Sequence, residues 1–209
     1  VHGEITPMRY GGNYKSYGPQ YPRGIQEGNG IPADGDLWVS YSVNKEDMWI
    51  SRIPVPVELK ASAHANDDFS KSKAISELTD WNIYSPVWAP VSLDGHWLKL
   101  QDKDPFDYAK VERKIPASKE LKVSFDLQAG QNDKGTLQIE FLDENGIACS
   151  RLELTPDGVF RAKGGSRFAN MMKYEAGKTY HVEAVLSTAD RNIQVYVDGK
   201  RVGLRMFYA

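Results

Sequence analysis

The sequence predicts an all-β protein built from short antiparallel strands. Apolar and polar residues alternate with period two over residues 121–128, 137–141, 180–186 and 193–197, as is typical of a sheet with one covered face. Turn sequences that tolerate positive φ separate these segments, among them DENG at 143–146 and the Asp-Gly pair at 198–199. Residues 70–81 carry only a weak helical stripe and are short enough to form a turn. Together these features favour a β-sandwich or barrel.

The first quarter of the chain contains a very apolar hairpin. Within residues 29–57, the strand DLWVSYSV pairs with DMWISRI across NKED, and Leu37, Val39 and Tyr41 share one face. An isolated hairpin is only marginally stable in water. The preceding Gly- and Tyr-rich segment adds about one more strand, giving roughly one four-stranded blade, and propeller blades bury one another. We therefore interpret residues 1–57 as a terminal β-propeller blade, a fragment whose sister blades lie upstream.

A domain boundary follows this hairpin. Pro54 and Pro56 cannot donate to a strand ladder, so the strand before them ends or runs along an edge. Small and polar residues come next, and we place a linker at residues 58–66. Residues 67–209 form one continuous pattern of strands and turns, which is a usual domain size.

Composition excludes several classes of protein. The net charge is −2 with acidic and basic residues interspersed, which argues against a nucleic-acid partner. No apolar run approaches the roughly 20 residues needed for a membrane span. The N-terminus lacks a signal-peptide pattern, so the protein is cytosolic or its leader has been removed. The single Cys149 forms no internal disulfide and is expected to be a half-buried thiol in a strand.

Several stretches resemble one known family. RYGGNYKSYGPQYPRGIQEGNG followed by DGDLWVSYSVNKEDMWISRIPVPV resembles the closing blade of bacterial BNR-repeat proteins of the sialidase superfamily. WNIYSPVWAPV, YEAGKTYHVEA and DRNIQVYVDGKRVG resemble the concanavalin A-like, or laminin G-like, jelly-roll sandwich that follows the propeller in those proteins. The resemblance covers essentially the whole chain, although the repeated Asp-box turns are missing. It implies a fragment of a secreted, periplasmic or cell-surface bacterial glycoside hydrolase.

The resemblance also implies a catalytic segment. Sialidase-type sites use a tyrosine nucleophile and arginines that hold an acidic group of the substrate. Tyr21 and Arg23 are two residues apart and share a face if residues 20–25 are extended, and Glu27 is placed to take the tyrosine proton. Further substrate-binding candidates in the same segment are Arg9, Lys15 and Tyr17. The alternative is that these tyrosines pack within a blade and that Arg23 forms a structural ion pair.

Tryptophans mark a second candidate surface. Trp38 and Trp49 are expected to pack between blades, whereas Trp81, Trp88 and Trp97 gather near the first strands of the sandwich. Aromatic faces bury a large area on a sugar ring at little entropic cost, so Trp88 and Trp97 are candidates for substrate binding. The alternative is that they plug the core or a domain interface.

Metal and anion sites are weakly indicated. The four histidines have no metal-ligand spacing, so we expect no zinc and no other required cofactor. Calcium is possible through a group of aspartates, although a solvated acidic turn is the alternative: Asp67, Asp68, Asp102, Asp104 and Asp107. The basic turn KGGSRF, which begins at Lys163, is interpreted as a hairpin loop, with anion contact as the alternative.

Three functions compete. The chain is the C-terminal part of a secreted glycoside hydrolase whose sandwich is structural or accessory, or it is a non-catalytic carbohydrate-binding or adhesion module, or the sandwich only braces the last blade. The first predicts carbohydrate and the upstream blades as partners. The fragment alone is expected to be inactive, because glycosidase chemistry needs an acid and a nucleophile or base at one bond.

Overall fold

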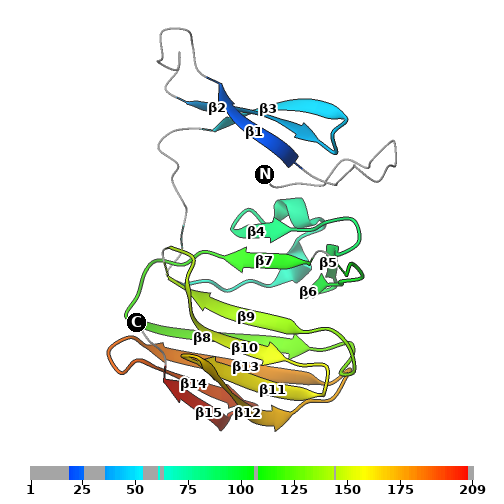
Figure 1. Cartoon of the computed structure of the whole chain (residues 1–209). Helices are drawn as coiled ribbons and strands as arrows, with labels where there is room; N and C mark the ends of the chain where they lie inside the picture. Colours follow the sequence, from blue (N-terminus) through cyan, green and yellow to red (C-terminus); the bar gives the residue numbers. More distant parts are fainter. Residues whose placement is uncertain are drawn as a thin grey trace. The chain divides into compact units, whose positions relative to one another are not determined.

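The computed structural model describes residues 19–25, 36–53, 61, 64–105, 108–143 and 145–206 (Figure 1). These residues are all-β, as the sequence predicts, and helix within them is limited to two 3₁₀ turns, η1 (Phe69–Lys71) and η2 (Ile75–Glu77). Residues 70–81 are therefore turns. The chain divides into two compact units, Val1–Pro116 and Ala117–Ala209. This division lies beyond the predicted linker at 58–66, which is partly outside the described residues and stays a prediction.

The first unit begins with a three-stranded antiparallel sheet. It contains β1 (Pro19–Ile25), β2 (Leu37–Val43) and β3 (Asp47–Ile53) in the order β1-β2-β3. The β2–β3 register places Leu37, Val39 and Tyr41 on one face, which confirms that prediction. Tyr41 is buried, and its hydroxyl lies 2.8 Å from that of Ser51. The assignment of this sheet to a propeller stays a prediction.

Four short strands follow in the first unit. β4 (Trp81–Tyr84) pairs with β7 (Lys110–Arg113), and β5 (Val91–Asp94) forms a hairpin with β6 (Trp97–Leu100). Gly95 adopts φ 63° in the turn of that hairpin, a conformation that suits glycine. The Arg113 guanidinium joins this region together through Asp67 at 3.1 Å and Asp80 at 3.5 Å.

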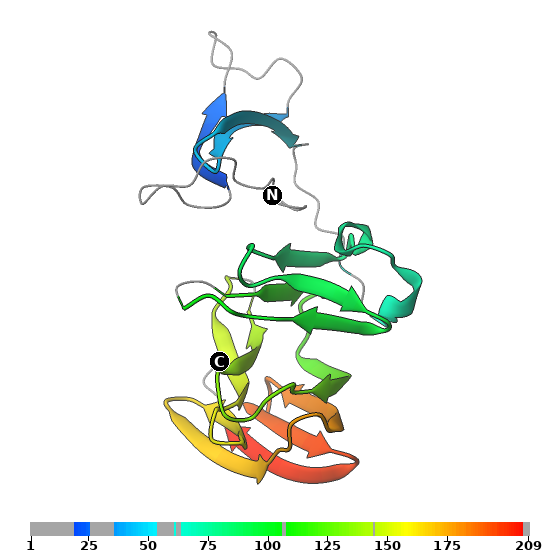
Figure 2. The same cartoon turned by 90° about the vertical axis from the view of Figure 1, so that its right-hand side faces the viewer.

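The second unit is a β-sandwich of two four-stranded antiparallel sheets (Figures 1 and 2). One sheet has the order β12-β11-β10-β9 and the other the order β15-β14-β13-β8. Their bounds are β8 Glu120–Gln128, β9 Leu137–Leu142, β10 Ala148–Leu154, β11 Val159–Gly164, β12 Arg167–Lys173, β13 Thr179–Ser187, β14 Asn192–Val197 and β15 Lys200–Met206. Alternate residues of both sheets meet in one core, where Leu152, Val182 and Ile193 are fully buried.

The two sheets converge at one edge, where β15 contacts β11 and β12. Gly203 permits this approach, because a Cβ at that position would lie 2.5 Å from Sδ of Met171 on β12. The residue therefore brings two edge strands, one from each sheet, into contact.

An ionic network covers the outer face of the β9–β12 sheet. Glu153 is only 3% exposed, and its carboxylate accepts bonds from Arg161 Nε at 2.8 Å and Gln138 Nε2 at 3.0 Å. Arg151 lies between Glu153 and Glu140. Its Nε donates to the Glu140 carboxylate at 2.7 Å. A buried carboxylate needs such partners, since burial without them is costly.

Candidate functional site

Trp88 lies at the tip of a firmly anchored loop between β4 and β5. Pro86 and Ala89 are buried at the base of the loop, and the Ala89 N–H donates to the Pro86 carbonyl at 3.1 Å. The Ser85 hydroxyl accepts the Val91 N–H at 2.8 Å, which closes the loop. At the tip, the Trp88 side chain is 57% exposed. Small or rigid residues therefore form the buried base of the loop, and the Trp88 indole is exposed to solvent.

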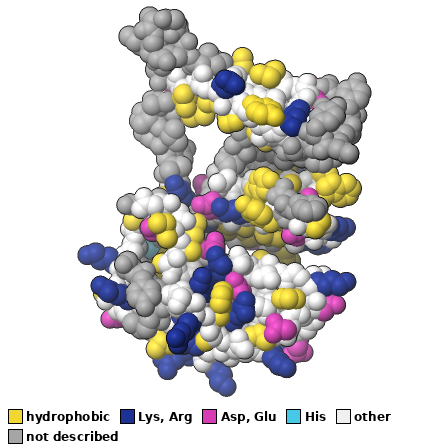
Figure 3. Space-filling view, viewed as in Figure 1, with side chains coloured by type: hydrophobic (Ala, Val, Ile, Leu, Met, Phe, Trp, Pro, Cys, Tyr) yellow, Lys and Arg dark blue, Asp and Glu magenta, His cyan; other side chains and the backbone are white. Residues whose placement is uncertain are grey.

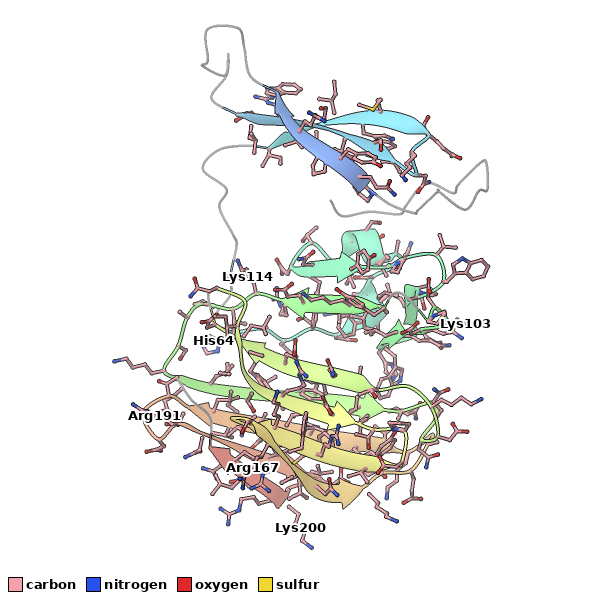
Figure 4. The ribbon with its side chains drawn as sticks, viewed as in Figure 1. His64, Lys103, Lys114, Arg167, Arg191 and Lys200 are labelled. Carbon is pink, nitrogen blue, oxygen red and sulfur yellow. The ribbon has the colours of Figure 1, made fainter. Side chains whose placement is uncertain are left out.

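A second segment holds this loop in place. The Lys103 N–H donates to the Trp88 carbonyl at 2.9 Å, and the Gln101 N–H donates to the Pro90 carbonyl at 3.0 Å. Figure 4 labels Lys103 beyond the β5–β6 hairpin, with its side chain pointing outward. Because hydrogen bonds fix the backbone on both sides of the loop, little backbone freedom is lost when a ligand binds the indole.

Two tyrosines are exposed near the same strands. Tyr84 ends β4, and its ring lies 5.7 Å from that of Tyr108 at an interplanar angle of 54°. Tyr84 pairs in register with Lys110 of β7. Trp88 and the Tyr84–Tyr108 pair are separate exposed aromatic groups of the first unit, and we refer to them together as the aromatic surface. Figure 3 shows exposed hydrophobic side chains over this part of the first unit.

The aromatic surface is suited to binding a sugar. Rings of this size stack on the apolar faces of sugar rings and bury a large apolar area in doing so. Aromatic anchors with few rotatable bonds also lose little entropy on binding. The arrangement supports recognition, which needs no general acid or nucleophile.

The sandwich interior offers no comparable site. A small void in the core is lined by apolar side chains and by Tyr174 and Tyr180. The Tyr174 hydroxyl donates to the Thr155 carbonyl at 2.7 Å, and the Tyr180 hydroxyl accepts the Glu175 N–H at 2.9 Å. Both hydroxyls are therefore engaged in holding the fold, and a polar sugar would find apolar walls.

The predicted catalytic segment is described only in part. Tyr21 is 64% exposed and lies in a β-bulge between Gln20 and Arg23, where its φ is 53°. This left-handed residue interrupts the regular alternation on which the shared face of Tyr21 and Arg23 was predicted. Lys45 places its ammonium 5.9 Å from the Tyr21 ring. The catalytic assignment stays a prediction, and Glu27, Arg9, Lys15 and Tyr17 lie outside the described residues.

The other two tryptophans of the group are half-buried. Trp81 packs against Phe69, with ring centroids 5.8 Å apart, and Trp97 lies beside the His96 ring at 6.0 Å. Trp88 is thus the most exposed indole of the three, and sugar contact by Trp97 stays a prediction.

The aspartates proposed for calcium have local roles. Asp68 accepts the Ser70 N–H at 3.1 Å, and hydrogen bonding from Ser70 lowers the pKa of its carboxyl. Asp102 accepts the Asp104 N–H at 2.8 Å, and Asp67 pairs with Arg113. The described part of the chain, which leaves out Asp107, contains no group of three such side chains placed to hold a metal ion. Calcium binding stays a prediction.

Sequence reasoning missed Tyr84 and Tyr108. The strand WNIY alternates, so Trp81 and Ile83 lie on the half-buried face, while Asn82 and Tyr84 are exposed. That alternation was visible and would have marked Tyr84 as outward-facing. No alternation marks Tyr108 as exposed, because this residue lies before β7 and outside any strand.

No helix among the described residues is long and apolar enough to cross a membrane.

Residues 81–209 match the family model described as "Sialidase-like, CBM domain". No curated protein matches the chain closely enough to count as a relative. A solved structure titled "Sialidase" matches with a TM-score of 0.78 and 91% sequence identity, and the match covers 100% of this chain and 19% of that one. The chain thus spans a small part of the sialidase that it matches.

Proposed function

Because the chain belongs to the sialidase-like CBM domain family, we propose that its matched residues 81–209 are the non-catalytic carbohydrate-binding part of a larger, secreted bacterial glycoside hydrolase of the sialidase type. The observation that carries the proposal is the exposed Trp88 on its anchored loop, inside the residues that match the family. A tryptophan face held in this way is a ready platform for a sugar ring. The matched region then keeps the enzyme close to its glycan, which raises the local concentration of substrate.

The three-stranded sheet supports the link to a larger protein. Met48 and Ile50 on β3 are 75% and 63% exposed, and Trp49 is also exposed. Such apolar exposure suits a sheet that meets further strands in the longer protein. We assign those strands to upstream propeller blades, and we assign Tyr21 and Arg23 to the rim of the site that these blades would complete.

A glycan array tests the binding proposal. The chain, detected through a terminal affinity tag that leaves its lysines unmodified, is expected to bind a restricted set of glycans, and Trp88→Ala is expected to weaken that binding about tenfold or more because the stacking platform is lost. Trp49→Ala is the matched control, since it removes an exposed tryptophan from another sheet. An array that stays blank with correctly folded protein would contradict the proposal.

The activity of the full-length enzyme tests the assignment of Tyr21 and Arg23 to the rim of the site. Tyr21→Phe and Arg23→Ala in the full-length protein are expected to lower turnover, whereas Tyr196→Phe on β14 serves as a control outside both the catalytic segment and the aromatic surface. Unchanged turnover for both variants would remove Tyr21 and Arg23 from the site.

A further inference from the structure

Three strands of the sandwich carry charge of one sign. Every ionisable side chain of β11, β12 and β15 is lysine or arginine, although the whole chain has a net charge of −2. These residues are Arg161, Lys163, Arg167, Lys173, Lys200, Arg201 and Arg205. Basic and acidic residues are interspersed elsewhere, so this segregation is local.

The fold gathers these cations at one edge. β12 and β15 are the edge strands of their sheets, and they contact each other where Gly203 faces Met171. Figure 4 labels Arg167 on β12 and Lys200 at the start of β15, and the Lys200 side chain points outward from the lower end of the sandwich. Figure 3 shows lysine and arginine side chains along the same end. We call this surface the basic edge.

Most of these cations lack an acidic partner. Arg161 is bound by Glu153, and Lys173 lies within electrostatic reach of Asp157. The remaining five make no ion pair with an acidic side chain in the described ranges: Lys163, Arg167, Lys200, Arg201 and Arg205. The Nε atom of Arg205 is moreover buried without a hydrogen-bond partner there.

Nearby acidic groups are engaged elsewhere. Asp198, in the turn before Lys200, accepts the His181 N–H at 2.9 Å, and Asp157 accepts the Thr155 hydroxyl. Glu175 lies 3.4 Å from Lys178. These hydrogen bonds leave the carboxylates charged, but the seven cations outnumber the four acidic residues Glu153, Asp157, Glu175 and Asp198, so the basic edge keeps a net positive potential that attracts anions.

An aromatic ring accompanies these charges. Phe168 on β12 is partly exposed, and the Arg161 guanidinium lies 4.2 Å from the centre of its ring. Lys163 places its ammonium 5.6 Å from the same ring. This combination offers both an apolar face and cations to one ligand.

We propose that the basic edge binds an acidic polysaccharide, a glycan whose sugars bear carboxylate or sulfate groups. The inference rests on the proposed carbohydrate-binding function and specifies the class of glycan. Seven-residue strands extend about 20 Å, and cations stand near both ends of β12 and of β15, so the charge is distributed over a length that suits a polymer. The planar forks of Arg167 and Arg201 match carboxylate and sulfate oxygens, which accept two parallel hydrogen bonds.

Binding to defined polymers tests the inference on the whole chain. Isothermal titration uses polygalacturonate as the carboxylated probe, heparin as the sulfated probe, dextran as the neutral probe and single-stranded DNA as a different polyanion. The chain is expected to bind polygalacturonate or heparin at about 50 mM salt and to lose that binding at about 500 mM, because salt screens exposed charges. Dextran is expected not to bind at this edge.

A charge-matched pair of variants locates the site. Arg167→Gln, Lys200→Gln and Arg201→Gln combined are expected to weaken acidic-polymer binding about tenfold or more, since three exposed ion pairs are lost. Lys114→Gln, Lys119→Gln and Lys134→Gln remove the same charge elsewhere and are expected to bind nearly as the original chain. If the first triple variant does not fold, Arg167→Gln alone and the salt dependence of the original chain carry the test.

The outcomes separate this inference from the proposed function. Equal weakening in both triple variants, tighter binding to DNA than to either acidic polysaccharide, or no binding to either would overturn the inference. Glycan binding that depends on Trp88 alone would leave the carbohydrate-binding function standing while the basic edge lost its role. Selective weakening by the first triple variant supports the inference.

Discussion

In the sandwich, Leu152, Val182 and Ile193 are fully buried between two four-stranded sheets, whereas Met48 and Ile50 of the β1–β3 sheet are largely exposed. Both regions are antiparallel and both have alternating sequences. The difference is that each sheet of the sandwich is covered by a second layer, which is what keeps an apolar face dry. The comparison teaches that the sandwich contains its own core, while the three-stranded sheet has apolar side chains available for contact with further chain.

The same substitution in both regions gives the largest expected contrast. Ile193→Ala should lower the free energy of unfolding by about 3 kcal/mol, because it removes buried methyl groups and leaves a cavity. Ile50→Ala should change it by less than about 0.5 kcal/mol, because that side chain is exposed. Urea unfolding measures both. Comparable losses at the two positions would mean that Ile50 is buried in solution.

Removing Glu153 from the ionic network should give the next-largest loss of stability. Glu153→Ala removes the acceptor of Arg161 and Gln138 and should destabilise the sandwich by about 2 kcal/mol, since partly buried donors lose their partner. Glu140→Ala removes a more exposed carboxylate bound to Arg151 and should cost less than about 1 kcal/mol. Thermal unfolding of the two variants compares them, and an equal loss would show that burial of Glu153 is unimportant.

Closure of the sandwich edge should give a smaller effect. Gly203→Ala places a Cβ against Met171 and should cost about 1–2 kcal/mol through overpacking. Met171→Ala in the same chain should recover part of that loss, because it removes the clashing atoms. A double-mutant cycle from urea unfolding measures the coupling. Strictly additive losses would argue that β12 and β15 do not press together at this point.

The alkylation rate of the Cys149 thiol tests the burial of β10 without any substitution in the sandwich. The thiol is half-buried, as the sequence predicts, and lies 3.2 Å from the Phe141 carbonyl. Burial raises the pKa of the Cys149 thiol, so less of the reactive thiolate is present near pH 8 than in a free cysteine. Alkylation should be slow in the folded chain, should rise with pH, and should become fast in urea. A folded-state rate equal to that of a small model thiol would disagree with this placement.

Alternation and turn chemistry predict most of the fold. They locate β2, β3, β8, β9, β13 and β14, because each of these strands has one face that must be buried. Cys149 is half-buried for the same reason. The contact between β12 and β15 at Gly203 cannot be predicted from alternation. It depends on how the two sheets pack together, and no periodic pattern in the sequence records that packing.

The candidate site was only partly predictable. Trp88 was a candidate because of its residue type, but the sequence does not reveal the bonds from Ser85 and Lys103 that present it. Tyr21 illustrates the opposite problem, because a two-residue bulge gives it a positive φ where alternation predicts an extended strand. Bulges depend on pairing with β2, which local sequence does not specify. The basic edge likewise combines strands that are far apart in the chain.

The indole N–H signals in a proton–nitrogen NMR spectrum test the central claim most directly. The chain contains five tryptophans, and the Trp88 signal can be assigned by its loss in Trp88→Ala. On titration with a glycan identified on the array, the Trp88 signal should shift in a saturable way, while the exposed Trp49 should stay in place. A saturable shift at Trp49 with none at Trp88 would contradict the assignment of sugar binding to the aromatic surface.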